Sequence, residues 1–368
     1  MGAWKHDTDP VHALCSLRRP RSVATLLGMG YLIGTDEAGY GPNLGPLVIS
    51  ATTWEVPDGV ENHDLHEHLA AVVCRKPAGK AAGRQSLAPP AGRSSHNRTA
   101  QLSPVAMADS KALYSPGKGL HNLEAGLYAA LAAVGLAPRS WRELWNALAP
   151  AAVERMRSIP WLADYDEPTP IDCDGERCAA MGEALRKGLD DARVKLIAIR
   201  SRVVFEEEFN TLVDRHGSKG TPLSLNTLAL AGESIASLPP GPVSVVCDKH
   251  GGRNRYAALL ANQFPHALIE IHGEGRPASR YRFGPQDRRV EFCFRMKAES
   301  CLPAALASMA SKYLRETAMR AFNEFWRRRL PDLKPTAGYP LDAKRFRADI
   351  AAEQRRLHID DRLLWRAV

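Results

Sequence analysis

The sequence lacks long apolar runs and is poor in cysteine and in aromatic residues. No apolar stretch approaches the ~18–20 residues of a membrane span, so we expect no membrane association. Only 7 of 368 residues are cysteines. Their odd number and scattered positions exclude the disulfide framework of a small secreted protein and indicate a reducing cytoplasm. Hydrophobic residues still make up 45% of the chain, which is typical of a globular protein and excludes a collagen, a coiled coil or a disordered tail.

Charge of one sign is missing from two segments. Residues 29–74 contain seven acids and no Lys or Arg, whereas residues 75–104 contain six basic residues and no acid. The whole chain has a formal net charge of +8, to which residues 249–300 and 312–366 also contribute a basic excess. A basic C-terminal half and an acidic N-terminal core predict a polyanionic partner near a site that itself requires carboxylates.

Composition divides the chain into segments. Residues 1–28 are interpreted as an unstructured extension or an over-called start, because Met29 stands immediately before the first expected strand. Residues 75–104 are Ala, Gly, Pro or Ser at 17 of 30 positions, which is typical of a flexible insertion without a core of its own. We expect one folded domain over residues 29–330 that carries this insertion, followed by a helical segment over residues 331–368.

Hydrophobic periodicity predicts an α/β fold. Short β-branched apolar runs indicate strands, and apolar residues at helical spacing indicate helices. The expected strands cover residues 31–34, 47–54, 194–199, 243–247, 268–272, 280–283 and 290–296. The expected helices cover residues 120–134, 141–148, 205–214, 225–237, 304–329 and 342–356, while residues 157–180 are expected to be loop. Strands mixed with helices in this way predict a mixed sheet with helices on its faces.

Four carboxylates stand at the ends of expected elements. Asp36 and Glu37 follow the first strand, Asp248 follows the strand over residues 243–247, and Glu299 opens the long helix. Singly, each has an ordinary explanation in turn or helix-dipole chemistry. Together they could supply the several oxygen ligands that hard divalent cations require. Two such cations about 3.5–4 Å apart activate a water and stabilise the leaving oxygen of a phosphodiester.

A glycine-rich turn with Gly39, Gly41 and Gly45 follows the first two acids. A dinucleotide-binding fingerprint is excluded, because that motif requires a helix directly after its glycines, and residues 47–54 indicate a strand. A glycine hairpin beside acids still lets backbone amides approach a phosphate or a sugar closely.

Residues 34–46, GTDEAGYGPNLGP, resemble the opening signature of the type 2 ribonucleases H (ribonuclease HII and HIII). The resemblance continues in order over most of residues 31–342. Its later parts are Asp109-Ser110-Lys111, Asn226 at the position where the family has an Asn-led helix, the strand before Asp248, Lys297-Ala298-Glu299-Ser300, Ala307-Ser308 with Ser311-Lys312, and Gly338-Tyr339-Pro340. The opening motif is specific, and the later motifs strengthen one another through their order.

The resemblance implies an RNase H-like fold and a metal-dependent endonuclease that hydrolyses the RNA strand of RNA/DNA hybrids. It implies that Mg²⁺ or Mn²⁺ is bound by four catalytic acids: Asp36, Glu37, Asp248 and Glu299. Ribonuclease HII usually has Asp at the last of these positions, and the HIII branch is more similar there. A metal-bound water would attack the phosphorus in line and leave 5′-phosphate and 3′-hydroxyl ends, while the second metal would stabilise the departing 3′ oxygen. No side-chain nucleophile and no obligate protein partner are implied, and residues 331–368 are expected to bind substrate.

The resemblance also implies a set of substrate-binding residues: Gly39, Tyr40, Gly41, Lys111 and Tyr339. In ribonuclease HII a Gly-Arg-Gly turn helps to read the ribose 2′-hydroxyl at an RNA–DNA junction, together with the tyrosine that Tyr339 matches. Here Tyr40 replaces that arginine and either stacks on a sugar or shields the turn. The replacement favours longer hybrids over single embedded ribonucleotides as substrates. Lys111 is either a phosphate ligand or a solvated lysine, and Tyr339 either reads the 2′-hydroxyl or packs in the interior.

The sequence leaves alternatives open for the residues after Asp248 and for the function of the chain. Lys249, His250 and Arg253 directly follow Asp248, and they either contact the scissile phosphate or form a surface turn.

A related nuclease for another structured nucleic acid, such as branched DNA, would keep the four acids but would not recognise the ribose. Tyr40, in place of the arginine of the turn, permits this alternative. A catalytically silent nucleic-acid-binding relative is the other alternative. Retention of four acids argues against it, because concentrated negative charge weakens binding to a phosphate backbone.

Overall fold

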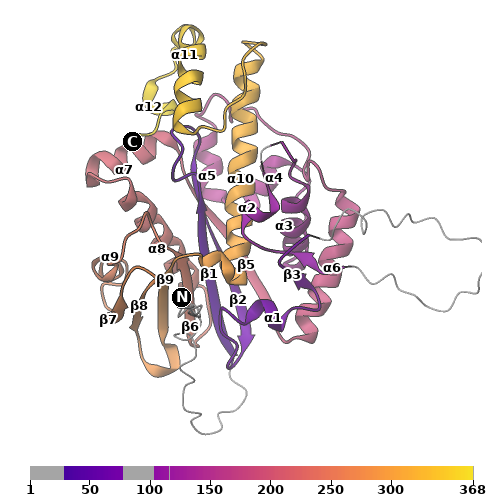
Figure 1. The fold of residues 1–368 in the computed structure, drawn as a ribbon, viewed down its shortest axis with the longest axis vertical. Helices are drawn as coiled ribbons and strands as arrows, with labels where there is room; N and C mark the ends of the chain where they lie inside the picture. Colours follow the sequence, from indigo (N-terminus) through magenta and orange to yellow (C-terminus); the bar gives the residue numbers. More distant parts are fainter. Residues whose placement is uncertain (1–28, 78–102, 116, 368) are drawn as a thin grey trace, which may run out of the picture.

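A computed structural model describes residues 29–77, 103–115 and 117–367 (Figure 1). The expectations for residues 1–28 and for residues 78–102 of the insertion concern parts of the chain outside the described residues. No helix within the described ranges is long and apolar enough to cross a membrane.

Seven strands form one mixed sheet in the order β5-β2-β1-β6-β9-β8-β7. Their bounds are β1 Met29–Ala38, β2 Leu47–Pro57, β5 Lys195–Val204, β6 Val243–Asp248, β7 Glu270–Glu274, β8 Ala278–Phe283 and β9 Val290–Arg295. β1 runs antiparallel to β2 and parallel to β6, and β6 runs parallel to β9. A second, two-stranded sheet joins β3 Val73–Cys74 to β4 Val105–Ala106. The predicted mixed sheet is confirmed.

Helices cover both faces of the large sheet. Their bounds are α1 Leu65–His68, α2 Ser110–Leu113, α3 His121–Ala133, α4 Trp141–Leu148, α5 Pro150–Met156, α6 Gly175–Asp191, α7 Glu206–His216, α8 Gly220–Ala236, α9 Ala257–Gln263, α10 Leu302–Arg327, α11 Pro340–Arg356 and α12 Asp361–Leu364. Among the described residues, short 3-10 turns also occur at η3 Gln286–Arg288 and η4 Ala298–Ser300. Figure 1 shows α10 crossing the sheet at β1 and β2, with α11 and α12 beside its C-terminal end as the predicted helical extension.

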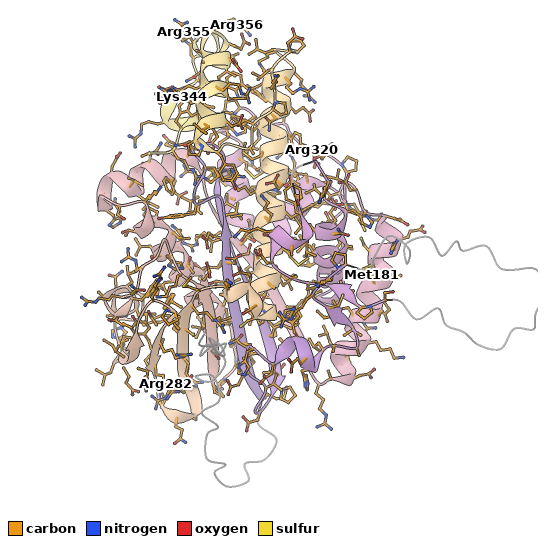
Figure 2. All side chains as sticks on the ribbon, in the orientation of Figure 1. Met181, Arg282, Arg320, Lys344, Arg355 and Arg356 are labelled. Carbon is orange, nitrogen blue, oxygen red and sulfur yellow. The ribbon has the colours of Figure 1, made fainter. Side chains whose placement is uncertain are left out.

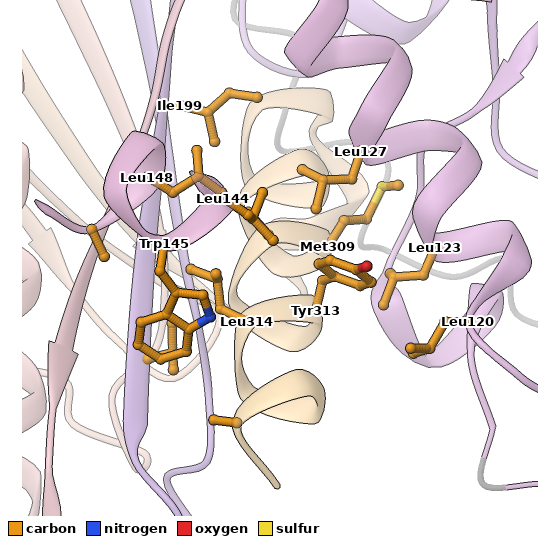
Figure 3. Packing of buried hydrophobic residues seen from close by; sticks show 14 of the residues in the cluster. Leu120, Leu123, Leu127, Leu144, Trp145, Leu148, Ile199, Met309, Tyr313 and Leu314 are labelled. Carbon is orange, nitrogen blue, oxygen red and sulfur yellow. The ribbon is translucent and has the colours of Figure 1, made fainter. Parts of the chain in front are cut away.

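Successive residues of β1 face different hydrophobic clusters, because neighbouring side chains in a strand point to opposite faces of the sheet. Leu32 belongs to a cluster with side chains of α3, α4 and α10, whereas Ile33 belongs to a cluster with side chains of α7, α8 and α9. In Figure 3, Met309 and Tyr313 of α10 point toward Leu123 of α3. This packing holds one side of α10, so the opposite side is fixed against the sheet.

Several element boundaries differ from the sequence prediction next to candidate site residues. Asp36 and Glu37 lie inside β1 rather than after it, because β1 pairs with β2 as far as Ala38 and Val48. Glu299 lies in η4 and not in the first turn of α10, which begins at Leu302.

Two further predictions about helices are wrong in detail. Asn226 does not lead a helix: it lies in the middle of α8, where its amide donates to the carbonyl of Pro222 at 2.9 Å. The expected loop over residues 157–180 gives way to α6 at its end, because the Asp174 side chain caps this helix by accepting from the N–H of Glu176.

Candidate active site

β1 and β6 bring acids from distant parts of the sequence to one edge of the sheet. The two strands are parallel neighbours and pair from Tyr31 with Val243 to Thr35 with Cys247. The next residues, Asp36 and Asp248, therefore occupy adjacent positions on the two strands. The carboxyl ends of parallel neighbours lie at the same edge of a sheet, so Glu37 is carried to this edge as well.

η4 places the fourth acid beside the third. The backbone N–H of Ala298 donates to Oδ1 of Asp248 at 3.2 Å, which holds the turn that contains Glu299 against the end of β6. Lys297, the residue before η4, has φ 57°. A positive φ of this kind is uncommon outside glycine and occurs mostly at tight turns. The unfavourable backbone conformation of Lys297 lies where the chain turns from β9 into η4.

α10 lies along β1 and supports Asp36. A Cβ at Gly34 would lie 2.1 Å from the backbone nitrogen of Ala304, so only glycine allows the helix to approach this closely. One turn later Ser308 hydrogen-bonds the Asp36 carboxyl group, and the hydroxyl of Ser311 donates to the Asp36 carbonyl at 3.0 Å. These helix positions recur at a spacing of three or four residues, which places them on one face.

Burial and mutual repulsion act on all four carboxyl groups. Burial and the Glu37 carboxylate raise the pKa of Asp36 well above its ordinary value, against the hydrogen bond from Ser308. Burial and the charge of Asp248 raise the pKa of Glu37 to about 7. Burial and the Asp248 charge also raise the pKa of Glu299, and burial raises that of Asp248 itself. The four acids therefore act on one another electrostatically, which is the behaviour of a shared site.

Lys111 is a cation that faces these acids. It lies in α2, whose N-terminus is capped by Asp109: the carboxylate accepts from the N–H of Lys111 at 3.0 Å. Although burial alone would lower the pKa of the Lys111 ammonium, the carboxylates of Asp109, Glu299 and Asp36 raise it. The side chain is also exposed. The Lys111 ammonium therefore lies beside the acids and open to solvent.

The chemistry of the four acids fits a hard divalent cation. Carboxylate oxygens are the ligands that Mg²⁺ and Mn²⁺ take in proteins, and a bound cation removes the repulsion that raises these pKa values. Within the described ranges, no three His, Cys, Asp or Glu side chains already stand close enough together to enclose an ion. The carboxylates would therefore have to move inward around a metal.

The turn between β1 and β2 has the backbone that its glycines predict. Gly39 has φ 94° and Gly45 has φ 84°, in the left-handed region that favours glycine. Gly41 is exposed, and a Cβ there would meet no atom within 4 Å. The backbone at Gly41 is thus open to a ligand.

Tyr40 leans over the loop that follows β6. A Cβ at Gly251 would lie 2.7 Å from the Tyr40 hydroxyl oxygen, and Nζ of Lys219 lies 5.6 Å from the centre of the tyrosine ring. Burial and the Glu37 charge raise the pKa of Tyr40, while Arg253 acts in the opposite direction. These contacts favour a shielding role for Tyr40 over stacking on a sugar.

Tyr339 lies next to the glycine turn although it stands 292 residues after Leu47, the first residue of β2. The carbonyl of Gly338 accepts from the backbone N–H of Asn43 at 2.7 Å and from that of Leu44 at 3.3 Å. Tyr339 itself is 53% exposed at the N-terminus of α11. The structure therefore excludes the interior packing role and places the ring at the surface beside the turn.

Two buried arginines that the sequence analysis did not single out hold this junction together. Nη2 of Arg315 donates to the carbonyls of Leu44 and Ala337, each at 3.1 Å. The backbone N–H of Arg366 donates to the carbonyl of Asn43 at 2.9 Å. Arg315 had a signal in the sequence, because it stands four residues after Ser311 in the resembling helix.

The turn residues after Asp248 are used for packing. Lys249 is buried, and its ammonium donates to Oδ1 of Asn254 and to the carbonyl of Gly275, both at 2.7 Å. His250 is also buried, and its Nδ1 lies 3.0 Å from the hydroxyl of Ser224. Burial lowers the pKa of His250 to about 3, so the ring is neutral at physiological pH. Neither of the two roles left open for these residues, a phosphate contact or a surface turn, agrees with the buried side chains of Lys249 and His250.

Comparisons with known proteins give distant structural similarities. No protein-family model and no curated protein matches the chain. Among solved structures, the chain is similar to ribonuclease H2 from Pyrococcus horikoshii OT3, with 14% identity over 91% of this chain and 92% of that one and a TM-score of 0.37. It is also similar to Aquifex aeolicus RNase H3, with 13% identity, coverage of 91% and 70%, and a TM-score of 0.35. Bst-RNase HIII in complex with Mn²⁺ is 15% identical, with coverage of 92% and 67% and a TM-score of 0.36.

Proposed function

We propose that this chain is a metal-dependent endonuclease of the type 2 ribonuclease H kind, which hydrolyses the RNA strand of RNA/DNA hybrids to 5′-phosphate and 3′-hydroxyl ends. The observation that carries the proposal is the meeting of four acids, Asp36, Glu37, Asp248 and Glu299, where the parallel strands β1 and β6 end beside η4. The same four positions match the acids of the signature that the sequence resembles. A pure nucleic-acid binder gains nothing from negative charge concentrated beside its ligand.

Mg²⁺ or Mn²⁺ would be held by these four acids. When bound, the ions supply activation of a water for in-line attack on phosphorus and stabilisation of the departing 3′ oxygen. The chain's own groups orient the ligands: Ser308 bonds the Asp36 carboxyl group, and the N–H of Ala298 bonds that of Asp248. Lys111 adds a positive charge where the scissile phosphodiester carries its negative charge.

The glycine turn and Tyr339 would distinguish RNA from DNA. The ribose 2′-hydroxyl both donates and accepts hydrogen bonds, and it is the group by which a protein tells the two strands apart. The open backbone at Gly41 and the exposed ring of Tyr339 lie on the same hydrogen-bonded junction. The Tyr40 side chain lies over Gly251. We therefore assign recognition of the ribose 2′-hydroxyl to the backbone of the turn and to Tyr339. This arrangement favours hybrids with a run of ribonucleotides.

The domain assignment follows from the same site. Residues 29–330 hold the acids and the sheet that positions them, and we assign catalysis to them. Residues 331–368 contain Tyr339, α11 and α12, and we assign substrate binding to them.

A panel of labelled substrates tests the proposal. Purified protein is incubated with an RNA/DNA hybrid, duplex RNA, duplex DNA, branched DNA and a DNA duplex with one ribonucleotide, each in Mg²⁺, Mn²⁺ or EDTA. We expect cleavage of the RNA strand of the hybrid in either metal, no cleavage in EDTA, and weaker cutting at the single ribonucleotide. Preferred cleavage of branched DNA would overturn the proposal in favour of a related nuclease.

A further inference from the structure

A cavity of about 230 Å³ lies between α11 and the C-terminal residues, beside the glycine turn. Its walls include Asn43 of the turn, Pro340, Lys344 and Arg347 of α11, and Trp365. The three α11 residues are spaced by four and three positions, so they lie on one face of the helix. That face is turned toward the turn and the C-terminal residues, and Figure 2 shows Lys344 on α11, below the helix end that carries Arg355.

The side chains that line this cavity carry positive charge and no negative charge. Lys344 is exposed, and among the described residues it has no ion-pair partner. Arg347 lies 5.1 Å from the centre of the Trp365 ring, and its Nη2 is 2.9 Å from Oδ2 of Asp361 at the surface. Lys344 is therefore the cation whose charge is fully available to a ligand.

A buried arginine also lines the cavity. Arg366 is 3% exposed, its guanidinium donates to the carbonyl of Pro42 and lies 4.9 Å from the centre of the Phe209 ring. Glu206 is the carboxylate that acts on it. Burial raises the pKa of Glu206 to about 7 and lowers that of Arg366 to about 9, while the opposite charges of the two groups act against both shifts. Arg366 is thus a third basic residue of the cavity lining, beside Lys344 and Arg347.

We propose that this cavity binds a phosphate group of the nucleic-acid backbone, with Lys344 as its principal cation and Arg347 beside it. The inference rests on the proposed function and extends it from the cleavage site to a separate backbone contact. Asn43 in the cavity wall is hydrogen-bonded to Gly338, the neighbour of Tyr339. A phosphate held here belongs to a nucleotide near the one whose ribose Tyr339 contacts, so the cavity would fix the register of the substrate without reading its bases.

The test measures hybrid binding to the wild-type protein and to Lys344→Ala in EDTA, at several salt concentrations. Removing one phosphate contact reduces the slope of log affinity against log salt by about 0.9. We expect this loss for Lys344→Ala, with a several-fold weaker affinity that is the same for hybrids of different sequence. Lys187→Ala is the matched control, because Lys187 is an exposed lysine on α6, outside the segment assigned to substrate binding. It should leave both affinity and slope unchanged.

Three results would overturn the inference. An unchanged slope in Lys344→Ala, while the wild type binds and cuts the hybrid, rules out the backbone contact and leaves the proposed function intact. Failure of the wild type to bind or cut any hybrid rules out both the backbone contact and the proposed function. Inorganic phosphate and a mononucleotide are added in thermal unfolding experiments: if either stabilises the wild type but not Lys344→Ala, and hybrid affinity is unchanged, the ligand is a free phosphate and not the nucleic acid.

Discussion

The guanidinium of Arg315 donates to the carbonyl of Leu44 at 3.1 Å, which joins α10 to the glycine turn. The same face of α10 carries Ser308 and Ser311, which bond Asp36. One helix therefore positions both the first acid and the turn that would contact substrate. A change in one of these contacts is expected to affect both catalysis and binding.

Replacing Arg315 by methionine tests this coupling. Arg315→Met leaves the carbonyls of Leu44 and Ala337 without their buried donor, so we expect a loss of about 3 kcal/mol in the free energy of unfolding and weaker hybrid binding. Urea denaturation and binding titration measure the two effects. Arg320→Met is the control on the same helix, because Arg320 is 52% exposed and pairs with Glu167 at 2.9 Å. It should cost under about 1 kcal/mol, and equal losses in the two variants would contradict the role of Arg315.

A methyl group at Gly34 should displace α10 from β1. Because the added Cβ would lie 2.1 Å from backbone atoms of Pro303 and Ala304, we expect Gly34→Ala to lower the free energy of unfolding by about 3 kcal/mol or more. Gly41→Ala adds the same methyl group where no atom lies within 4 Å. Its stability should match the wild type, while its hybrid affinity falls because the open backbone is covered. Equal stability of the two variants in urea denaturation would contradict the close packing of α10.

Lys249 should matter for stability and not for binding to phosphate. Lys249→Met removes the ammonium that donates to Asn254 and Gly275, which leaves buried acceptors unpaired and should cost about 2–4 kcal/mol. The salt dependence of hybrid binding should stay at the wild-type slope. A reduced slope with unchanged stability would instead make Lys249 a phosphate ligand.

Divalent cations should stabilise the folded protein through the four acids. A ligand at a hundred times its dissociation constant adds about 2.7 kcal/mol to the free energy of unfolding. We expect Mn²⁺ to give a stabilisation of this order in the wild type and a much smaller one in Asp248→Asn, measured by denaturation with Mn²⁺ or EDTA. Glu183→Gln removes an exposed acid that pairs with Arg186 and should respond to Mn²⁺ as the wild type does. An equal response in all three proteins would place the metal elsewhere.

The sequence allowed the acids to be predicted but not the way in which they meet. Asp36 and Asp248 each stand near the end of a recognisable apolar strand, and local pattern is enough to find them. Their adjacency depends on the parallel pairing of residues 31–35 with 243–247, and no local pattern specifies which strands become neighbours. The order of the motifs in the resembling family supplied that relationship.

The role of charged turn residues was harder to predict. Lys249 and His250 follow a strand and precede two glycines, a pattern typical of a surface loop, yet both are buried. The Lys249 ammonium donates to Asn254 and Gly275, whereas His250 contacts Ser224 of α8 and the hydroxyl of Tyr256. Arg366 was missed for the opposite reason, because nothing near it in the sequence shows that it packs against the glycine turn 324 residues away. Burial of a charged group is decided by distant partners, which periodicity does not reveal.

Cleavage of an RNA/DNA hybrid labelled on its RNA strand, by the wild type and by Asp36→Asn, tests the central claim most directly. The account predicts cutting of the RNA strand by the wild type in Mg²⁺ or Mn²⁺, products with 5′-phosphate and 3′-hydroxyl ends, and no cutting in EDTA. Asp36→Asn should be folded and inactive, since it lacks one metal-binding carboxylate. Cleavage that persists in EDTA or in folded Asp36→Asn would contradict a metal-dependent site built on these acids.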